Sequence, residues 1–166
     1  MKRIVVLLAA LISIWGVTAF AGTQDTIINM EIPAVLSLEW DTNGVDHLDL
    51  TGVNAITLVE FANGYKDSIA GGNLLASSNA NYDITIKAVD TYFSGGSGTK
   101  PTSDMLVDVN SAGFMALDGT NEVTLVYNNP PETNGVKTLT YKIIFTPNDT
   151  QGVYFTTLTY TIKATL

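Results

Sequence analysis

Alternation of apolar and polar residues is the strongest pattern in this chain. Every second position from Leu158 to Leu166 is apolar, whereas the intervening positions from Thr157 to Thr165 are polar. Because successive side chains of a β-strand point to opposite faces, this segment predicts a strand with one buried face. Three further segments show the same pattern, with the expected buried sets Tyr82, Ile84, Ile86 and Ala88; Val123, Leu125 and Tyr127; and Leu139, Tyr141, Ile143 and Phe145.

Turn-forming pairs are spread between these segments. The pairs are Asn43-Gly44, Asn63-Gly64, Gly71-Gly72, Asp118-Gly119, Asn134-Gly135 and Gln151-Gly152. Glycine and asparagine adopt positive φ at low cost and therefore suit tight reversals of the chain. No segment predicts a long helix. We therefore expect an all-β fold, an antiparallel immunoglobulin-like β-sandwich of about eight strands.

The first 21 residues have the three parts of a secretory signal peptide. Lys2 and Arg3 precede an apolar run from Ile4 to Ile14, and Ala19-Phe20-Ala21 has the small-x-small form of a cleavage site. The alternative, an N-terminal membrane anchor, fits less well because the run is shorter than the roughly 20 residues that span a bilayer. We expect cleavage after Ala21, a single β-sandwich domain over residues 22–166, and no transmembrane segment thereafter. The mature protein is expected in the periplasm, at the cell surface or outside the cell.

Charge narrows the classes of partner. Loss of Lys2 and Arg3 leaves six of the eight basic residues against sixteen acidic ones, a net charge of −10. A negative protein without a basic cluster repels phosphate backbones, so nucleic acid is not an expected partner. The classes that remain are a second copy of the chain, other surface proteins and glycans.

The residues that usually carry catalysis are scarce. The chain has one histidine, His47, and no cysteine. It therefore offers few residues that could form the nucleophile and base pair of nucleophilic catalysis. Gly96-Ser97-Gly98 lacks the five-residue Gly-x-Ser-x-Gly form of a nucleophile elbow. We predict that the protein is not an enzyme and has no organic cofactor.

Residues 41–49 contain many side chains with oxygen atoms, which makes this run a candidate calcium-binding site. Carboxylate and amide oxygens are the ligands that calcium prefers, although the spacing is not that of an EF-hand. The same residue types also form turns by bonding their own backbone, which is the competing interpretation. The candidate ligands are Asp41, Asn43, Asp46 and Asp49.

Aromatic residues near loops are candidates for stacking on sugar rings. Tyr65, Tyr92 and Phe93 could form such a platform, whereas Trp40 continues an apolar stripe and is expected in the core. The glycine- and serine-rich stretch from Ser94 to Pro101 predicts a long exposed loop.

The N-terminal part of the mature chain carries an unusually long apolar stripe. Alternate positions from Ile28 to Trp40 are apolar, and the stripe continues across Pro33, which suggests an edge strand or a crossing between sheets. One hypothesis is that Thr26 to Ile32 is a detachable strand that completes a neighbouring subunit's sheet. An ordinary edge strand within the same chain is the alternative. The strand-exchange candidates are Ile28, Met30 and Ile32.

Three segments, residues 32–38, 77–86 and 152–162, resemble the pattern of small bacterial surface β-sandwiches. The similarity is to fimbrial subunits of the spore-coat-U type and to WxL-like wall proteins, although disulfide cysteines and a Trp-x-Leu pair are absent. It implies an exported structural or adhesive role at the cell surface. The signal peptide, the alternating faces and the long N-terminal stripe favour a non-enzymatic subunit of this kind, with a pilus or filament assembled by strand exchange as its specific form. The alternative is a secreted module that binds glycans or another ligand through its loops.

Overall fold

The computed structural model of this chain describes residues 30–42 and 50–165. These residues are mostly in antiparallel strands, which confirms the predicted all-β class. The expected signal peptide and cleavage site lie outside the described residues. The chain divides into two units at Ile32, and the second unit, Pro33–Leu166, contains all the described strands and helices.

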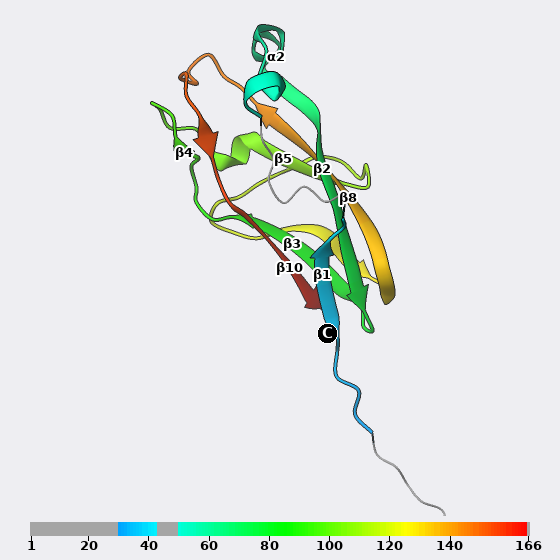
Figure 1. The fold of residues 1–166 in the computed structure, drawn as a ribbon. Coiled ribbons are helices and arrows are strands. Elements are labelled where there is room, and N and C mark those ends of the chain that lie inside the picture. Colours follow the sequence, from blue (N-terminus) through cyan, green and yellow to red (C-terminus); the bar gives the residue numbers. More distant parts are fainter. Residues whose placement is uncertain (1–29, 43–49, 166) are drawn as a thin grey trace, which may run out of the picture. The chain divides into compact units, whose positions relative to one another are not determined.

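Two sheets and one small ribbon make up the fold (Figure 1). The first sheet, sheet A, has the strand order β1-β2-β8-β5-β6, and the second, sheet B, has the order β10-β3-β7. Strands β4 and β9 pair with each other. The described strands are β1 (Leu36–Trp40), β2 (Tyr65–Ser78), β3 (Tyr82–Ala88), β4 (Ser94–Gly95), β5 (Met105–Val109), β6 (Met115–Ala116), β7 (Val123–Asn129), β8 (Glu132–Ile144), β9 (Tyr154–Phe155) and β10 (Leu158–Ala164).

Helical structure in the described residues is short. The helix α2 (Leu58–Asn63) begins at a capping box, in which Thr57 and Glu60 satisfy each other's backbone N–H groups, and ends at Gly64 with φ of 81°. The Thr-x-x-Glu pattern is visible in the sequence. Two 3₁₀ turns, η1 (Gly52–Asn54) and η2 (Thr102–Asp104), complete the set.

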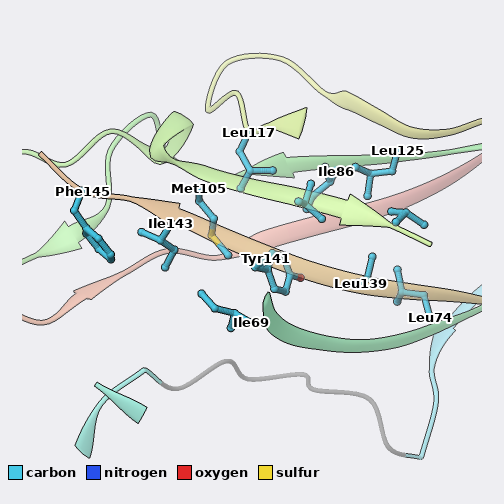
Figure 2. Close-up of a cluster of buried hydrophobic side chains, with 12 residues drawn as sticks. Ile69, Leu74, Ile86, Met105, Leu117, Leu125, Leu139, Tyr141, Ile143 and Phe145 are labelled. Carbon is cyan, nitrogen blue, oxygen red and sulfur yellow. The ribbon is translucent and has the colours of Figure 1, made fainter. Parts of the chain in front are cut away.

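The core lies between sheets A and B. Figure 2 shows Leu139, Tyr141 and Ile143 of β8, with Phe145 just after it, gathered with side chains of neighbouring strands that include Ile86 of β3. Ile86 and Val107 are fully buried, and Tyr141 is 4% exposed. The alternating sets expected for β3 and β8 are confirmed as buried, so these two segments form the two halves of a sandwich core.

Two expected turns lie inside strands instead. Gly71-Gly72 falls within β2 and Asn134-Gly135 within β8, each at a shift in the register between these two strands. Positive φ suits a β-bulge as well as a turn, and Gly72 and Asn134 have φ of 78° and 52°. A Cβ at Gly71 would meet the Tyr141 ring, so glycine is required there to pack the core. The bulges explain why β2 and β8 are longer than the sequence pattern predicts.

The expected burial of Tyr127 is wrong. Its side chain is 79% exposed, while Val126 packs against the core instead. The cause is a register shift, because Ile84 pairs with Val126 whereas Thr85 pairs with Thr124. The extra residue in β7 reverses which positions face the core, so that Val126 points inward and Tyr127 points outward.

The stretch from Ser94 to Pro101 is more structured than expected. Ser94–Gly95 pairs with Tyr154–Phe155, and Lys100 at the end of the stretch is 4% exposed. Ser94 to Ser97 is exposed as expected, but the stretch is not a free loop, because its start pairs with β9 and Lys100 binds Asp149 in the segment that follows β8.

Candidate functional site

The edges of sheets A and B meet where β1 lies beside β10, a region that we call the seam. In the described part of the chain, β1 borders sheet A and β10 borders sheet B. Trp40 of β1 packs edge-to-face against Tyr160 of β10, with ring centroids 5.6 Å apart. Because β10 has a strand partner on one side only among the described residues, its other side presents backbone groups that could pair with an added strand.

Burial across the seam is incomplete. Ile84 of β3 is 1% exposed and Ile86 is fully buried, but their register partners on β10, Ile162 and Tyr160, remain partly exposed. Trp40 is 36% exposed, so the expectation that it lies in the core is wrong, and its ring packs at the sheet edge instead. The apolar side chains of β10 therefore remain partly exposed at the seam, whereas those of the neighbouring strand β3 are buried.

Tyr160 also links the seam to the centre of sheet A. Its hydroxyl is hydrogen-bonded to that of Tyr141 on β8. Burial raises the pKa of Tyr160 above its usual range, and the neighbouring Tyr141 adds to the effect. Burial likewise raises the pKa of Tyr141. Both hydroxyls are therefore protonated. The hydrogen bond between them fixes the position of β10 against β8.

The strand-exchange candidates that can be placed are exposed. Met30 is 76% exposed and Ile32 is 67% exposed, and residues 30–35 belong to no strand. Ile28 lies outside the described residues. The expected long strand therefore begins only at Leu36, because Pro33 has no N–H to donate to a ladder.

Asn79 holds the chain where it enters β1. Its side chain accepts a hydrogen bond from Val35 N at 2.7 Å and donates one to Pro33 O at 3.0 Å. Its backbone N–H donates to Val35 O at 3.3 Å. Asn79 lies in the turn between β2 and β3, so residues 33–35 are fixed at that end of the sandwich without being part of a sheet.

Of the four calcium candidates, the described residues include Asp41 alone. Asp41 Oδ1 accepts hydrogen bonds from the backbone and side chain of Thr42, and Asp41 N donates to Asn73 O. Asn43, Asp46 and Asp49 lie outside the described residues. Within residues 30–42 and 50–165, no three acidic, histidine or cysteine side chains come together as a metal site would require.

The three aromatic residues expected to form a platform differ in burial. Phe93 packs against the core, whereas Tyr65 and Tyr92 are 40% and 52% exposed. Tyr65 begins β2 and Tyr92 forms an isolated bridge to Pro101. The structure instead brings Tyr65 close to Lys142, which lies 4.0 Å above the centre of its ring.

A buried lysine cluster is a feature that sequence reasoning missed. Lys100 Nζ donates to Asp149 at 2.6 Å, to Asp104 at 3.0 Å and to the Ile144 carbonyl at 2.7 Å. Although burial acts to raise the pKa of Asp149, hydrogen bonds from Lys100 and Thr146 hold it below its usual value. These bonds join the segment before β5 to the segment after β8. We interpret the cluster as structural, because every group in it is satisfied within the chain.

Of the residues considered for nucleophilic chemistry, the structure describes Ser97. Ser97 Oγ donates to the Gln151 carbonyl at 3.0 Å, which ties two loops together. His47 lies outside the described residues.

Among the residues that the structure places, no helix is both long and apolar enough to cross a membrane. Comparison of the chain with protein-family models, with curated proteins and with solved structures gave no match.

Proposed function

We propose that this protein is a non-enzymatic structural subunit of the cell surface that assembles by strand exchange at the seam. In this proposal the segment Thr26 to Ile32 of one copy adds to the free side of β10 in the next copy. The observation that carries it is the partly exposed apolar face of β10, at an edge of sheet B, in a chain that also exposes Met30 and Ile32.

The two surfaces complement each other chemically. An added strand would pair its backbone with β10 and bury alternate side chains, as in other cases of β-strand addition. Ile28, Met30 and Ile32 are at alternate positions and are apolar, whereas Asn29 and Glu31 between them are polar. Each buried side chain of this size contributes about 1.5–3 kcal/mol. Three such side chains would stabilise an assembly together with the backbone hydrogen bonds.

Exchange between copies is favoured over folding back within one copy. A fold-back onto β10 requires a reversal of the chain before β1. The residues between Met30 and Leu36 include neither glycine nor asparagine, and Asn79 holds Pro33 and Val35 on both sides of Ala34. A tight reversal over this stretch is therefore disfavoured.

A location outside the cytoplasm is part of the same proposal. The charged start, apolar run and Ala-Phe-Ala ending support export and cleavage after Ala21. N-terminal sequencing of the exported protein should begin at Gly22. An exported fraction that still begins at Met1 would contradict this.

A charge placed on the apolar side of the exchanged strand is expected to abolish assembly. Met30→Asp would bury an unpaired carboxylate in the seam, whereas the neighbouring Asn29→Asp adds the same charge on the polar side. Size-exclusion chromatography over a range of concentrations should give polymers for the unchanged chain and Asn29→Asp, and monomers for Met30→Asp.

Two further forms of the chain complete this experiment. Deletion of residues 22–32 should also give a monomer, and a synthetic peptide of those residues should bind to it. An unchanged chain that stays monomeric at every concentration would overturn strand exchange. Equal assembly of the Met30→Asp and Asn29→Asp variants would do the same.

A further inference from the structure

The outer face of sheet A, the side away from the core, is hollowed at its centre. Here Ala70 of β2 lies beside Thr140 of β8, and Gly72 of β2 lies beside Leu139. Because the β2 residues carry little or no side chain, an open hollow of about 550 Å³ forms between β2, β8 and β5. This volume falls in the range of about 300–1,000 Å³ that is typical of small-molecule sites.

Aromatic rings stand at this face of the sheet. Phe114 lines the hollow, and both Phe114 and Tyr65 are 40% exposed. Lys142 of β8 lies between them, with its Nζ 4.0 Å from the centre of the Tyr65 ring and 5.9 Å from that of Phe114. These cation–π contacts restrict both rings while their other surfaces remain accessible.

The loop that carries Phe114 is fixed by hydrogen bonds. Asn110 N donates to Thr138 O, Thr138 N donates to Asn110 Oδ1, and both distances are 2.9 Å. Gly113 N donates to Asp108 Oδ1 at 3.0 Å. Asn110 and Ser111 both have positive φ, of 53° and 61°, a backbone conformation that costs free energy in residues other than glycine. The ring of Phe114 is thus held beside the hollow by a strained loop that the sheet anchors.

We propose that this hollow binds a neutral glycan chain. Exposed aromatic rings stack on the apolar faces of sugar rings, and side-chain hydroxyl, amide and carboxylate groups bond sugar hydroxyls. The hollow has all of these groups, in Phe114, Thr138, Thr140, Asn73 and Asp108. Its open form suits an internal stretch of a polysaccharide.

Charge selects among the polymers that could fill the hollow. The lining includes Asp108 and no basic residue, and the whole chain carries a net charge of −8. Lys142 beside it is already engaged by two rings. Nucleic acids and acidic polysaccharides are therefore disfavoured relative to uncharged ones. The site lies on the outer face of sheet A and the adjoining β5–β6 loop, away from the seam, so it does not depend on assembly.

Affinity electrophoresis tests the glycan site. The whole exported chain is run through native gels that contain hydroxyethylcellulose, xylan, galactomannan or laminarin, and through gels with alginate or heparin. We expect slower migration with at least one neutral polysaccharide. Phe114→Ala should weaken the interaction about tenfold, because a stacking ring is lost. Tyr127→Ala removes a ring that is 79% exposed on sheet B and should change nothing.

Three outcomes would overturn the glycan site. One is unchanged migration in all four neutral gels, and another is slower migration in the anionic gels alone. The third is equal migration of Phe114→Ala and the unchanged protein, with circular dichroism showing that the variant is folded.

Discussion

Replacing Lys100 by methionine is expected to lower the free energy of unfolding at neutral pH by about 3–5 kcal/mol. The side chain of Lys100 is 5% exposed and that of Asp149 is 11% exposed, so the substitution leaves a carboxylate largely buried without its cation. It also removes the bond from Lys100 Nζ to the Ile144 carbonyl and the contact with the Phe145 ring. Methionine fills a similar volume, which limits any cavity.

The dependence on pH distinguishes this loss from a packing defect. In the unchanged protein the folded-state pKa of Asp149 lies below its usual value of 3.8. Its contribution to stability is therefore present above that value and is lost as the pH falls through the folded-state pKa. In the variant the uncompensated carboxylate gains a proton more readily, so the difference between the two proteins should shrink below about pH 4.

Urea unfolding at pH 7 and pH 3 measures both effects. The double variant Lys100→Met with Asp149→Asn should recover part of the loss, since it no longer buries that carboxylate. A loss below about 0.5 kcal/mol at pH 7 would contradict the structural role of the cluster, because such values are typical of exposed sites. A loss that is the same at both pH values would contradict its electrostatic origin.

Truncation of Ile84 to alanine is expected to cost about 2–5 kcal/mol, the range for a fully buried aliphatic side chain. Ile84 is 1% exposed, and its register partner across the sheet is Ile162 of β10. The alternating sequence pattern predicts that both isoleucines are buried. Ile162 remains partly exposed at the seam, so Ile162→Ala should cost about half as much or less in the monomer.

This matched pair also reports on assembly. If another strand covers the seam, Ile162 becomes buried, and the cost of Ile162→Ala should approach that of Ile84→Ala in the polymer. Denaturant unfolding of the deletion variant that lacks residues 22–32, with and without the synthetic peptide, separates the two states. Equal costs for both isoleucines in the monomer would contradict an open seam.

Alternation predicted the fold class because side-chain period follows directly from strand geometry. It failed where a single extra residue reverses the faces, as at Tyr127, since a bulge leaves no mark on composition. Gly71-Gly72 and Asn134-Gly135 were assigned to turns for a related reason, because positive φ serves both turns and bulges. Only pairing with the neighbouring strand distinguishes the two. The immunoglobulin-like arrangement of strands stays a prediction.

The candidate sites were less predictable than the fold. Ile28, Met30 and Ile32 could be named from periodicity, but the seam depends on which strands form the sheet edges, and that is a property of the topology. Phe114 carried no local signal, because its role comes from a loop held to β8 through Asn110. Lys100 looked like part of a polar loop, and its two carboxylate partners are 4 and 49 residues away in the sequence.

Cross-linking between two singly substituted chains tests strand exchange most directly. The chain has no cysteine, so any disulfide must join the introduced residues. Glu31→Cys is placed on the polar side of the exchanged segment, and Thr159→Cys or Thr161→Cys on the polar side of β10. Neighbouring strands bring such residues within the Cα separation of about 4.4–6.8 Å that a disulfide requires. Thr124→Cys on β7, at the other edge of sheet B, is the control.

The two chains are mixed, assembled and oxidised, and the products are identified by mass spectrometry. Strand exchange predicts a disulfide-linked pair of chains for Glu31→Cys with at least one β10 variant, and none with Thr124→Cys. Absence of a link to either β10 variant, or equal linking to Thr124→Cys, would contradict the proposed assembly at the seam.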